Sequence, residues 1–325
     1  MTVLVTGAAG FIGYHVGEAL LARGDAVLGV DNLDPYYDVG LKQARLDRLA
    51  GKPGFTFHGI DIAERGALAA ACREAGIDRV VHLAAQAGVR HSIEDPFVYG
   101  RANLMGHLEV LELCRHAPGF VHLVYASSSS VYGGNAKLPF AETDRVDTPA
   151  SLYGATKKAD ELMSYTYSDL YRIPATGLRF FTVYGPWGRP DMAYYTFTKA
   201  IFDGATIRLF NHGNMKRDFT YIDDIVAGVV AALDHPPADD GEAAPHRLYN
   251  IGNHRPEPLP RFIEVLEKAI GRKAIIELAP MQPGELVETF ADIAAIQRDL
   301  GFAPVTPIDE GLPRFVDWYR GYHGV

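Results

Sequence analysis

Cysteine is scarce in this chain: Cys72 and Cys114 are the only two among 325 residues. Each lies in a helical pattern without a metal-ligand partner nearby, which argues against a disulfide framework and against a zinc site. We therefore expect no bound metal and interpret both cysteines as small core residues.

Long apolar runs and surplus positive charge are missing as well. No stretch reaches the roughly 18 uninterrupted apolar residues that a membrane helix needs, and Met1 leads directly into a strand-like segment without a basic leader. These absences predict a soluble, unexported, cytoplasmic protein without a membrane partner. The net charge of −9 argues against a nucleic-acid partner, because phosphate backbones are recognised by clustered cations.

The chain does have enough apolar residues for a full globular core, with 48% hydrophobic and 22% charged residues. Over the first 180 residues, short runs rich in Val, Ile and Leu alternate with segments of helical period, which is typical of a parallel sheet covered on both faces. The predicted fold class is α/β, a doubly wound parallel sheet of the Rossmann type with a second, smaller C-terminal lobe. The predicted strands are 2–6, 26–31, 54–58, 79–83, 120–126 and 174–181, and the predicted helices lie near 11–23, 64–75, 99–116 and 152–171.

After Tyr184 the pattern changes to a turn-rich segment, residues 185–190, followed by shorter elements with scattered prolines. A predicted helix over 222–233 and a predicted strand over 247–251 indicate that the chain then returns to the large lobe. The predicted domains are a Rossmann domain of residues 1–181 plus about 220–251, and a smaller substrate-binding lobe of residues 182–219 plus 252–325.

A glycine-rich turn follows the first predicted strand. Gly7 can form a tight turn, Gly10 allows the backbone to approach a pyrophosphate, and Gly13 lets the next helix pack against the strand. Asp31 ends the second strand, where an acid can bond ribose hydroxyls and repel a 2′-phosphate, so the pattern favours NAD over NADP. The alternative interpretation is a structural turn beside a surface aspartate.

Further cofactor contacts are expected where the neighbouring strands end, at the same edge of the sheet. Asn103 on the following helix is equally well an ordinary polar helix residue. The predicted cofactor-binding residues are Gly7, Gly10, Phe11, Ile12, Gly13, Asp31, Asn32, Asp61, Ile62, Leu83, Ala84, Ala85, Asn103, Tyr153 and Lys157.

Tyr153 and Lys157 are four residues apart in a helix predicted to start near Ser151, so both side chains project from one face. An ammonium beside a phenol stabilises phenolate, which makes Tyr153 a candidate general base, although such a pair also occurs by chance. The fifth strand ends in four serines, residues 127–130. Their hydroxyls can bond a reacting oxygen at the carboxyl edge of the sheet, or they can form only a polar turn.

These residues resemble those of the extended short-chain dehydrogenase/reductases, and within them the nucleotide-sugar 4-epimerases. The resemblance covers essentially the whole chain. It rests on the glycine triplet, the serine-rich strand end, the Tyr153 to Lys157 spacing and residues 217–224. Longer strings at 31–38, 86–90 and 180–193 are most similar to the UDP-glucuronate 4-epimerases.

The resemblance implies a redox-neutral reaction with NAD, in which UDP-glucuronate and UDP-galacturonate interconvert through a transient 4-keto sugar. It implies that Tyr153, Lys157 and Ser128 are catalytic, that the Rossmann domain binds NAD, and that the smaller lobe binds the nucleotide sugar. Thr182 and Arg189 would hold the sugar carboxylate. The substrate-binding residues that it implies are Ala87, Ser128, Ser129, Thr182, Arg189, Arg217 at the diphosphate, and Glu285 at the uridine ribose, where the family usually has aspartate.

The resemblance also implies a homodimer through the helices near 99–116 and 152–171. Apolar residues there, such as Leu104, Leu108 and Leu111, are equally well explained by packing on the sheet.

Other activities remain to be weighed against this one. In this family, 4,6-dehydratases and decarboxylating xylose synthases place carboxylates after the catalytic serine or threonine, whereas Ser129 and Ser130 stand here. An epimerase of another UDP-sugar would leave Arg189 without a carboxylate to meet. The alternative interpretation of Arg189, which lies in a Gly/Pro-rich loop, is a surface residue. A non-catalytic NAD sensor would need neither Tyr153 nor Lys157.

Overall fold

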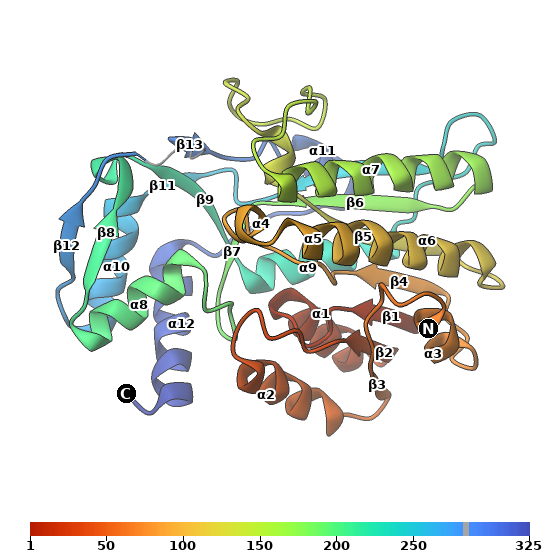
Figure 1. Ribbon diagram of the computed structural model, residues 1–325, viewed down its shortest axis with the longest axis horizontal. Helices are drawn as coiled ribbons and strands as arrows, with labels where there is room; N and C mark the ends of the chain where they lie inside the picture. Colours follow the sequence, from red (N-terminus) through yellow and green to blue (C-terminus); the bar gives the residue numbers. More distant parts are fainter. Residues whose placement is uncertain (282–285) are drawn as a thin grey trace.

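The computed structural model describes residues 1–281 and 286–325, and a seven-stranded sheet forms its centre (Figure 1). The strands of this sheet are β1 (Thr2–Thr6), β2 (Ala26–Asp31), β3 (Phe55–Gly59), β4 (Arg79–His82), β5 (His122–Ser128), β6 (Ala175–Phe180) and β10 (His246–Ile251). They lie in the order β10-β6-β5-β4-β1-β2-β3, and all neighbouring strands are parallel. The predicted α/β fold with a doubly wound parallel sheet is confirmed.

Helices cover both faces of this sheet (Figure 1). Successive residues of a strand point to opposite faces, so Val3 and Val5 of β1 enter one apolar cluster and Leu4 enters the other. The first cluster contains α1 and α9, and the second contains α3 and α6. The helices around the sheet are α1 (Phe11–Ala22), α2 (Val39–Ala50), α3 (Ala67–Cys72), α4 (His91–Glu94), α5 (Pro96–Tyr99), α6 (Gly106–His116), α7 (Leu152–Tyr171), α9 (Ile222–Asp234) and α11 (Ala294–Leu300).

A second, smaller group of elements lies at the carboxyl edge of the sheet, on the left of Figure 1. Its central strand, β9 (Lys216–Tyr221), pairs with β7 (Thr182–Tyr184), which begins two residues after β6 ends. The other elements are α8 (Ala193–Asp203), β8 (Thr206–Leu209), β11 (Pro256–Pro258), α10 (Leu259–Ile270), β12 (Ile275–Leu278), β13 (Glu288–Thr289) and α12 (Ile308–His323).

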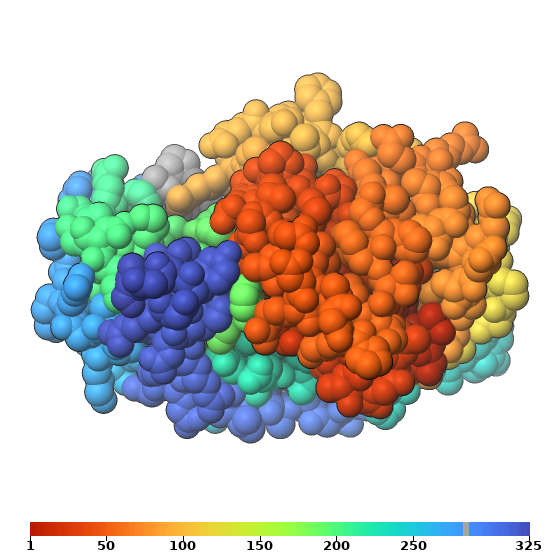
Figure 2. Space-filling model, turned by 90° about the horizontal axis from the view of Figure 1, so that it is seen from below, coloured from red at the N-terminus to blue at the C-terminus, as the bar shows by residue number. Residues whose placement is uncertain are grey.

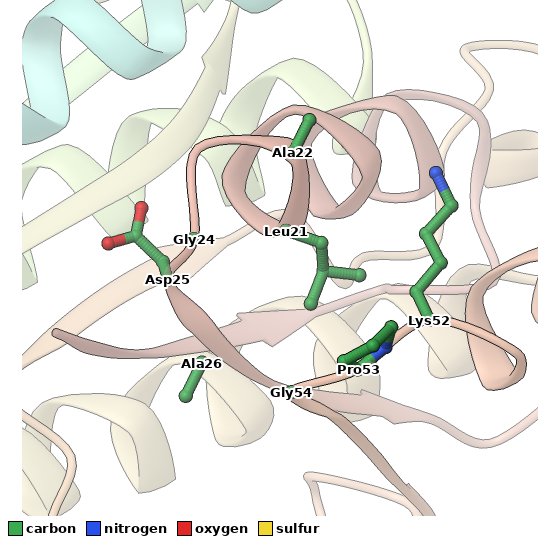
Figure 3. Close-up of a pocket in the computed structure, with 8 residues that line it drawn as sticks. All are labelled: Leu21, Ala22, Gly24, Asp25, Ala26, Lys52, Pro53 and Gly54. Carbon is green, nitrogen blue, oxygen red and sulfur yellow. The ribbon is translucent and has the colours of Figure 1, made fainter.

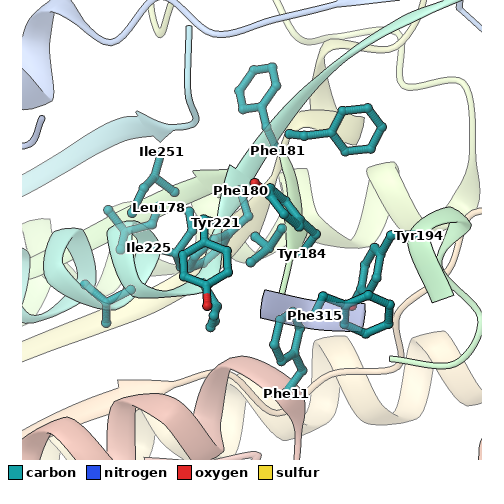
Figure 4. Packing of buried hydrophobic residues seen from close by; sticks show 14 of the residues in the cluster. Phe11, Leu178, Phe180, Phe181, Tyr184, Tyr194, Tyr221, Ile225, Ile251 and Phe315 are labelled. Carbon is teal, nitrogen blue, oxygen red and sulfur yellow. The ribbon is translucent and has the colours of Figure 1, made fainter. Parts of the chain in front are cut away.

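The two groups share one apolar core. Figure 4 shows aromatic side chains from α1, β7, β9, α8 and α12 gathered at their junction. The rings of Tyr184 and Tyr221 lie 5.6 Å apart, and those of Tyr194 and Phe315 lie 4.9 Å apart in an edge-to-face arrangement. Because Phe11 of α1 belongs to the same buried cluster, the smaller group is packed directly against the start of the first helix.

The C-terminal helix α12 and the segment around α2 also approach each other at this junction, whereas the two chain ends lie on opposite sides of the molecule (Figure 1). Seen from below, the dark blue C-terminal helix lies beside red-orange N-terminal residues, with green residues between them (Figure 2). Trp187 joins these segments, because its ring lies 5.3 Å from that of Trp318 on α12 and 5.3 Å from the guanidinium of Arg48 on α2.

Several predicted boundaries were wrong. The strand predicted at 120–126 runs from His122 to Ser128, because Ser127 and Ser128 continue the parallel ladder with β6. The helix predicted at 64–75 is shorter, and the left-handed Gly66 precedes its start. The helix predicted near 99–116 begins as a π-helix, η1 (Gly100–Met105), before α6. The helix α2 was not among the predicted elements.

Both cysteines are free and buried, which confirms their interpretation as core residues. In the two described ranges, no helix is long and apolar enough to cross a membrane.

Candidate active site

The glycine-rich turn joins β1 to the first turn of α1. Gly7 has a φ of +72°, and a Cβ there would lie 2.8 Å from the backbone nitrogen of Ala84. A Cβ on Gly13 would lie only 2.0 Å from the carbonyl oxygen of Gly7. The turn is therefore closed against both the helix and the end of β4, and the amide groups at the start of α1 face the carboxyl edge of the sheet.

Asp31 lies beside this turn at the end of β2. One oxygen of its carboxylate accepts a hydrogen bond from the amide of Ala9 at 3.1 Å, and the other accepts one from Leu33 at 2.8 Å. Two charge-assisted bonds to backbone amides hold the carboxylate in place. Asn32 is exposed, and its side chain accepts a bond from the amide of Asp34.

The other residues predicted to bind the cofactor lie on neighbouring strand ends. Leu83 and Ala84 follow β4 and bond Thr6, which places them against the glycine-rich turn. Asp61 follows β3, and its carboxylate pairs with Arg101 at 2.8 Å. The predicted residues around them, Phe11, Ile12, Ile62 and Ala85, are buried or half-buried.

Asn103 has its side chain fully engaged inside the protein. It accepts a bond from the amide of Gln86 and donates bonds to the carbonyl of Gln86 and the hydroxyl of Thr156. Its side chain therefore fixes the loop after β4 against α7, and the structure gives it this supporting role whether or not it also touches a cofactor.

Tyr153 and Lys157 lie on the first two turns of α7. Ser151 caps the start of the helix, because its hydroxyl accepts a bond from the amide of Gly154 at 3.0 Å. Tyr153 is half-buried, and its ring meets that of Tyr99 edge to face at 6.1 Å. Lys157 is buried, and its ammonium pairs with the carboxylate of Asp160 at 3.0 Å.

The serine-rich strand end packs against the start of this helix. A Cβ on Gly154 would lie 2.5 Å from the carbonyl oxygen of Ser130, so the two backbones are in close contact there. The hydroxyl of Ser128 accepts a bond from the amide of Ser130 at 3.2 Å and thereby caps a short 3₁₀ helix, η2 (Ser129–Tyr132). The fold thus brings Ser128 and Ser129 to the same end of the sheet as Tyr153.

A buried ion pair supports this strand end, and sequence reasoning missed it. Both carboxylate oxygens of Glu161 accept bonds from the guanidinium of Arg179, at 2.7 and 2.9 Å. The hydroxyl of Ser127 donates to the same carboxylate at 2.6 Å, and Arg179 also donates to Tyr132. Glu161 lies eight residues after Tyr153 on α7, so its partner on β6 could not be read from spacing.

The residues predicted to meet the sugar carboxylate lie in β7 and in the loop that follows it. Thr182 is the first residue of β7 and is half-buried. Arg189 is also half-buried, and its guanidinium pairs with the carboxylate of Asp191 at 2.5 and 3.0 Å. Burial opposes the charge of Arg189, but the adjacent Asp191 outweighs it, and the pKa of Arg189 is raised above its ordinary value.

The remaining predicted substrate residues lie on separate elements. Ala87 is half-buried in the loop after β4, whereas Arg217 lies on β9, where its guanidinium donates to the carbonyls of Lys216 and Val287. Glu285 lies outside the described residues.

Arg45 on α2 is a second residue that sequence reasoning missed. It is fully buried and donates to the carbonyls of Ala9, Trp187 and Gly188 at distances between 2.6 and 3.1 Å. One guanidinium therefore ties the glycine-rich turn to the loop that carries Arg189. Because α2 was not among the predicted helices, nothing in the sequence indicated that Arg45 is buried or what it bonds.

A hollow of about 600 Å³ lies at the opposite edge of the sheet (Figure 3). It is lined by the turn before β2 and the turn before β3, including Gly24, Asp25, Lys52 and Pro53. Ligands of such folds bind outside the carboxyl ends of the strands, whereas this hollow lies at the amino ends, away from Tyr153. Among the described residues, no three His, Cys, Asp or Glu side chains cluster closely enough to hold a metal ion.

The model of the NAD dependent epimerase/dehydratase family matches residues 3–252. This chain belongs to that family. A probable UDP-glucuronate 4-epimerase of Rhizobium meliloti is 46% identical over 98% of this chain and 97% of its own length. UDP-glucuronate 4-epimerase 3 of Arabidopsis thaliana is 47% identical, and the match covers 99% of this chain and 77% of that protein.

Solved structures of the family are also similar to this one. The crystal structure of UDP-glucuronic acid 4-epimerase from Bacillus cereus, in complex with UDP-glucuronic acid and NAD, superposes with a TM-score of 0.91. It is 34% identical to this chain, and the match covers 99% of this chain and all of that one.

Proposed function

We propose that this protein is an NAD-dependent UDP-glucuronate 4-epimerase, which interconverts UDP-glucuronate and UDP-galacturonate. The observation that carries the proposal is that Tyr153, Ser128 and the loop that bears Arg189 lie at the carboxyl edge of one sheet. The chain also matches, over nearly its whole length, relatives that are named for this activity.

The glycine-rich turn fits a dinucleotide. Cβ atoms at Gly7 and Gly13 would collide with backbone, so the turn is closed in a way that only glycine permits, and helix amides face the space beyond it. Asp31, fixed by Ala9 and Leu33, would bond the adenosine ribose. The proposed cofactor contacts are those predicted from the sequence, with Lys157 and Tyr153 at the nicotinamide end. Bound there, NAD would supply reversible hydride transfer at sugar carbon 4.

The protein's own residues would bind, orient and move a proton. Tyr153 would take the proton of the 4-hydroxyl as a general base, with Ser128 bonding the same oxygen. Lys157 would stabilise the phenolate. Arg217 would hold the diphosphate as a fixed anchor while the 4-keto ring turns over.

The carboxylate needs a specific restraint in this reaction. The 4-keto form of a glucuronosyl group is a β-keto acid, which loses CO2 when the bond to the carboxylate aligns with the carbonyl π system. Arg189 and Thr182 would hold the carboxylate near the ring plane, where that alignment is forbidden. Ser129 and Ala87 would complete this side of the sugar pocket.

This placement supports a separate binding function for each of the two parts of the chain. We propose that residues 1–181 with about 220–251 bind NAD, and that residues 182–219 with 252–325 bind the nucleotide sugar, with Glu285 near the uridine ribose. A cytoplasmic location is proposed as well, because two buried free cysteines are compatible with a reducing compartment.

A homodimer is also proposed, through α6, α7 and the π-helix η1. Leu162 and Tyr165 are three residues apart on one face of α7 and are 57% and 51% exposed. Met105, at the end of η1, is 50% exposed. Large apolar side chains exposed together on neighbouring helices favour a protein partner, here a second copy of the chain.

The deciding experiment is an assay of the NAD-loaded protein with UDP-glucuronate, followed by NMR of the nucleotide sugars. Formation of UDP-galacturonate supports the proposal. Release of CO2 with a UDP-pentose would instead indicate decarboxylation, and turnover of UDP-glucose but not UDP-glucuronate would indicate an epimerase of neutral sugars. Protein that retains NAD but converts none of these sugars would point to a sensor.

A further inference from the structure

The guanidinium of Arg189 is held by one edge only. Its Nε donates to Oδ1 of Asp191 at 3.0 Å, and its Nη2 donates to Oδ2 at 2.5 Å. An arginine has five N–H groups in a rigid planar fork, so one bidentate carboxylate uses two of them. In the described part of the chain Nη1 has no hydrogen-bond partner, so the edge formed by Nη1 and Nη2 can take a second carboxylate.

Tyr36 makes a second bond to Asp191, at the same carboxylate oxygen that accepts Nη2 of Arg189. The hydroxyl of Tyr36 donates to Oδ2 of Asp191 at 3.2 Å. Tyr36 comes from the loop after β2, whereas Asp191 and Arg189 come from the loop after β7. The aspartate therefore lies between two loops that are far apart in sequence, with a bond to each.

Tyr36 is connected to Tyr153 through Gly88 and Tyr99. Gly88 has a φ of +116°, and a Cβ there would lie 2.8 Å from the hydroxyl of Tyr36. The hydroxyl of Tyr99 donates to the carbonyl of Gly88 at 2.6 Å, and the ring of Tyr99 meets that of Tyr153 at 6.1 Å. Neighbouring residues thus link Asp191 to Tyr153, and Arg189 itself lies close enough to Tyr153 for the tyrosine to contribute electrostatically to its raised pKa.

The backbone that carries Arg189 is fixed independently. Its amide donates to the hydroxyl of Tyr194 at 3.0 Å, and Arg45 bonds the carbonyls of Trp187 and Gly188 just before it. Because the backbone is held separately, the bonds to Asp191 set only the side-chain torsions of Arg189. A free arginine would lose that rotamer freedom on binding substrate, whereas a pre-ordered one has already lost it.

We infer that Asp191, oriented by Tyr36, is a positioning residue that holds Arg189 by its Nε/Nη2 edge, so that the Nη1/Nη2 edge is presented to the carboxylate of the sugar. This inference rests on the proposed function, because it assigns a carboxylate-bearing substrate to Arg189. Asp191 does not touch the substrate in this scheme; it makes the arginine rigid and selective.

The test compares binding of UDP-glucuronate and UDP-glucose to NAD-loaded protein by calorimetry, together with KM and kcat for UDP-glucuronate. Asp191→Asn should weaken UDP-glucuronate binding and raise its KM about fivefold to tenfold, the scale of one long side chain ordered on binding. Affinity for UDP-glucose, which has no carboxylate, and kcat should change less than about twofold. Tyr36→Phe should act in the same direction by a smaller factor, and it removes only one hydroxyl, which keeps the test valid if Asp191→Asn folds poorly.

Glu94→Gln is the matched control. Glu94 is exposed, lies near Tyr36 and pairs with His91 rather than with Arg189, so its variant removes the same charge without touching the arginine. It should leave the preference for UDP-glucuronate over UDP-glucose unchanged.

Three outcomes would overturn the inference. If Asp191→Asn keeps the wild-type preference, Asp191 does not position Arg189, and the proposed function stands unaffected. If Asp191→Asn binds UDP-glucuronate more tightly, Asp191 blocks the arginine and must be displaced by substrate. If the wild-type protein itself shows no preference for UDP-glucuronate and does not convert it, the proposed function fails, and the inference fails with it.

Discussion

Several side chains at the candidate site are fixed by bonds within the protein before any ligand binds. Asp31 bonds two backbone amides, Ser128 caps a short helix, and Arg189 is paired with Asp191. Each retains lone pairs or N–H groups for a further partner. Such pre-ordering lowers the entropy that ligand binding must remove. It also explains why the same polar side chains make bonds within the protein and can still bond a ligand.

Tyr153 is the residue whose loss we expect to be most costly for turnover. Tyr153→Phe removes the phenol oxygen that would accept the proton of the 4-hydroxyl, so turnover of UDP-glucuronate should fall at least about a hundredfold. The ring itself remains to pack against Tyr99, so bound NAD and the melting temperature should be nearly unchanged. The measurements are kcat, the NAD content of purified protein and thermal unfolding. Near-normal turnover would exclude Tyr153 as the base.

At the scale of elements, the contact between α1 and the turn before it depends on Gly13. A Cβ there would lie 2.0 Å from the carbonyl of Gly7, so Gly13→Ala must push the helix away from the turn. We expect loss of NAD from the purified protein and a lower melting temperature. Gly17→Ala on the same helix is the control: its Cβ would meet only Leu49 at 3.5 Å, and alanine favours helix by up to about 1 kcal/mol. Equal NAD content in the two variants would contradict this account.

The joint between β5, β6 and α7 depends on the buried pair of Glu161 and Arg179. Glu161→Gln leaves the guanidinium of Arg179 buried without its charge partner. We therefore expect the free energy of unfolding, measured in urea, to be about 3 to 5 kcal/mol lower than in the wild type. Glu277→Gln breaks an exposed pair with Arg208 and should lower the free energy of unfolding by at most about 1 kcal/mol. Similar losses in both variants would argue against a supporting role for the buried pair.

The same pair makes stability depend on pH in a defined direction. Burial opposes ionisation of Glu161, but Arg179 outweighs it, and the pKa of Glu161 lies below its ordinary value of 4.5. A carboxylate with a lowered pKa stabilises the fold above its unfolded pKa, and that contribution is lost as the pH falls through the folded pKa. The difference in unfolding free energy between wild type and Glu161→Gln should therefore be full at neutral pH and shrink on acidification below 4.5. A difference that grows in acid would contradict this sign.

At the scale of the whole molecule, the exposed apolar face of α7 predicts a dimer. Replacing both Leu162 and Tyr165 by glutamate puts two charges on this face, and sedimentation should then show a monomer. Val305→Glu changes a still more exposed apolar residue away from α6 and α7 and should leave the assembly unchanged. A wild-type protein that sediments as a monomer at micromolar concentration would refute the dimer.

The local pattern of the sequence was sufficient for the large sheet. Its strands β1 and β2 have the predicted bounds. Strand β4 differs from its prediction by one residue at one end, and β3 and β6 differ by one residue at both ends. The agreement is close because each strand is a short apolar run between turn signals. The glycine triplet and the four-residue spacing of Tyr153 and Lys157 could also be read directly, since both depend on neighbours along the chain. Errors arose at Ser127 and Ser128, where pairing with β6 overrides the turn tendency of serine.

By itself, the sequence determined the fold class, the family and the residue types available for chemistry, because periodicity and short motifs act over a few residues. Only the tertiary structure decided which distant side chains meet. Asp191 bonds Tyr36 across 155 positions, Arg45 bonds Trp187 across 142, and Glu161 of helix α7 pairs with Arg179 of strand β6. Such partners are set by how loops and elements pack in three dimensions, and no spacing in a single chain specifies that packing.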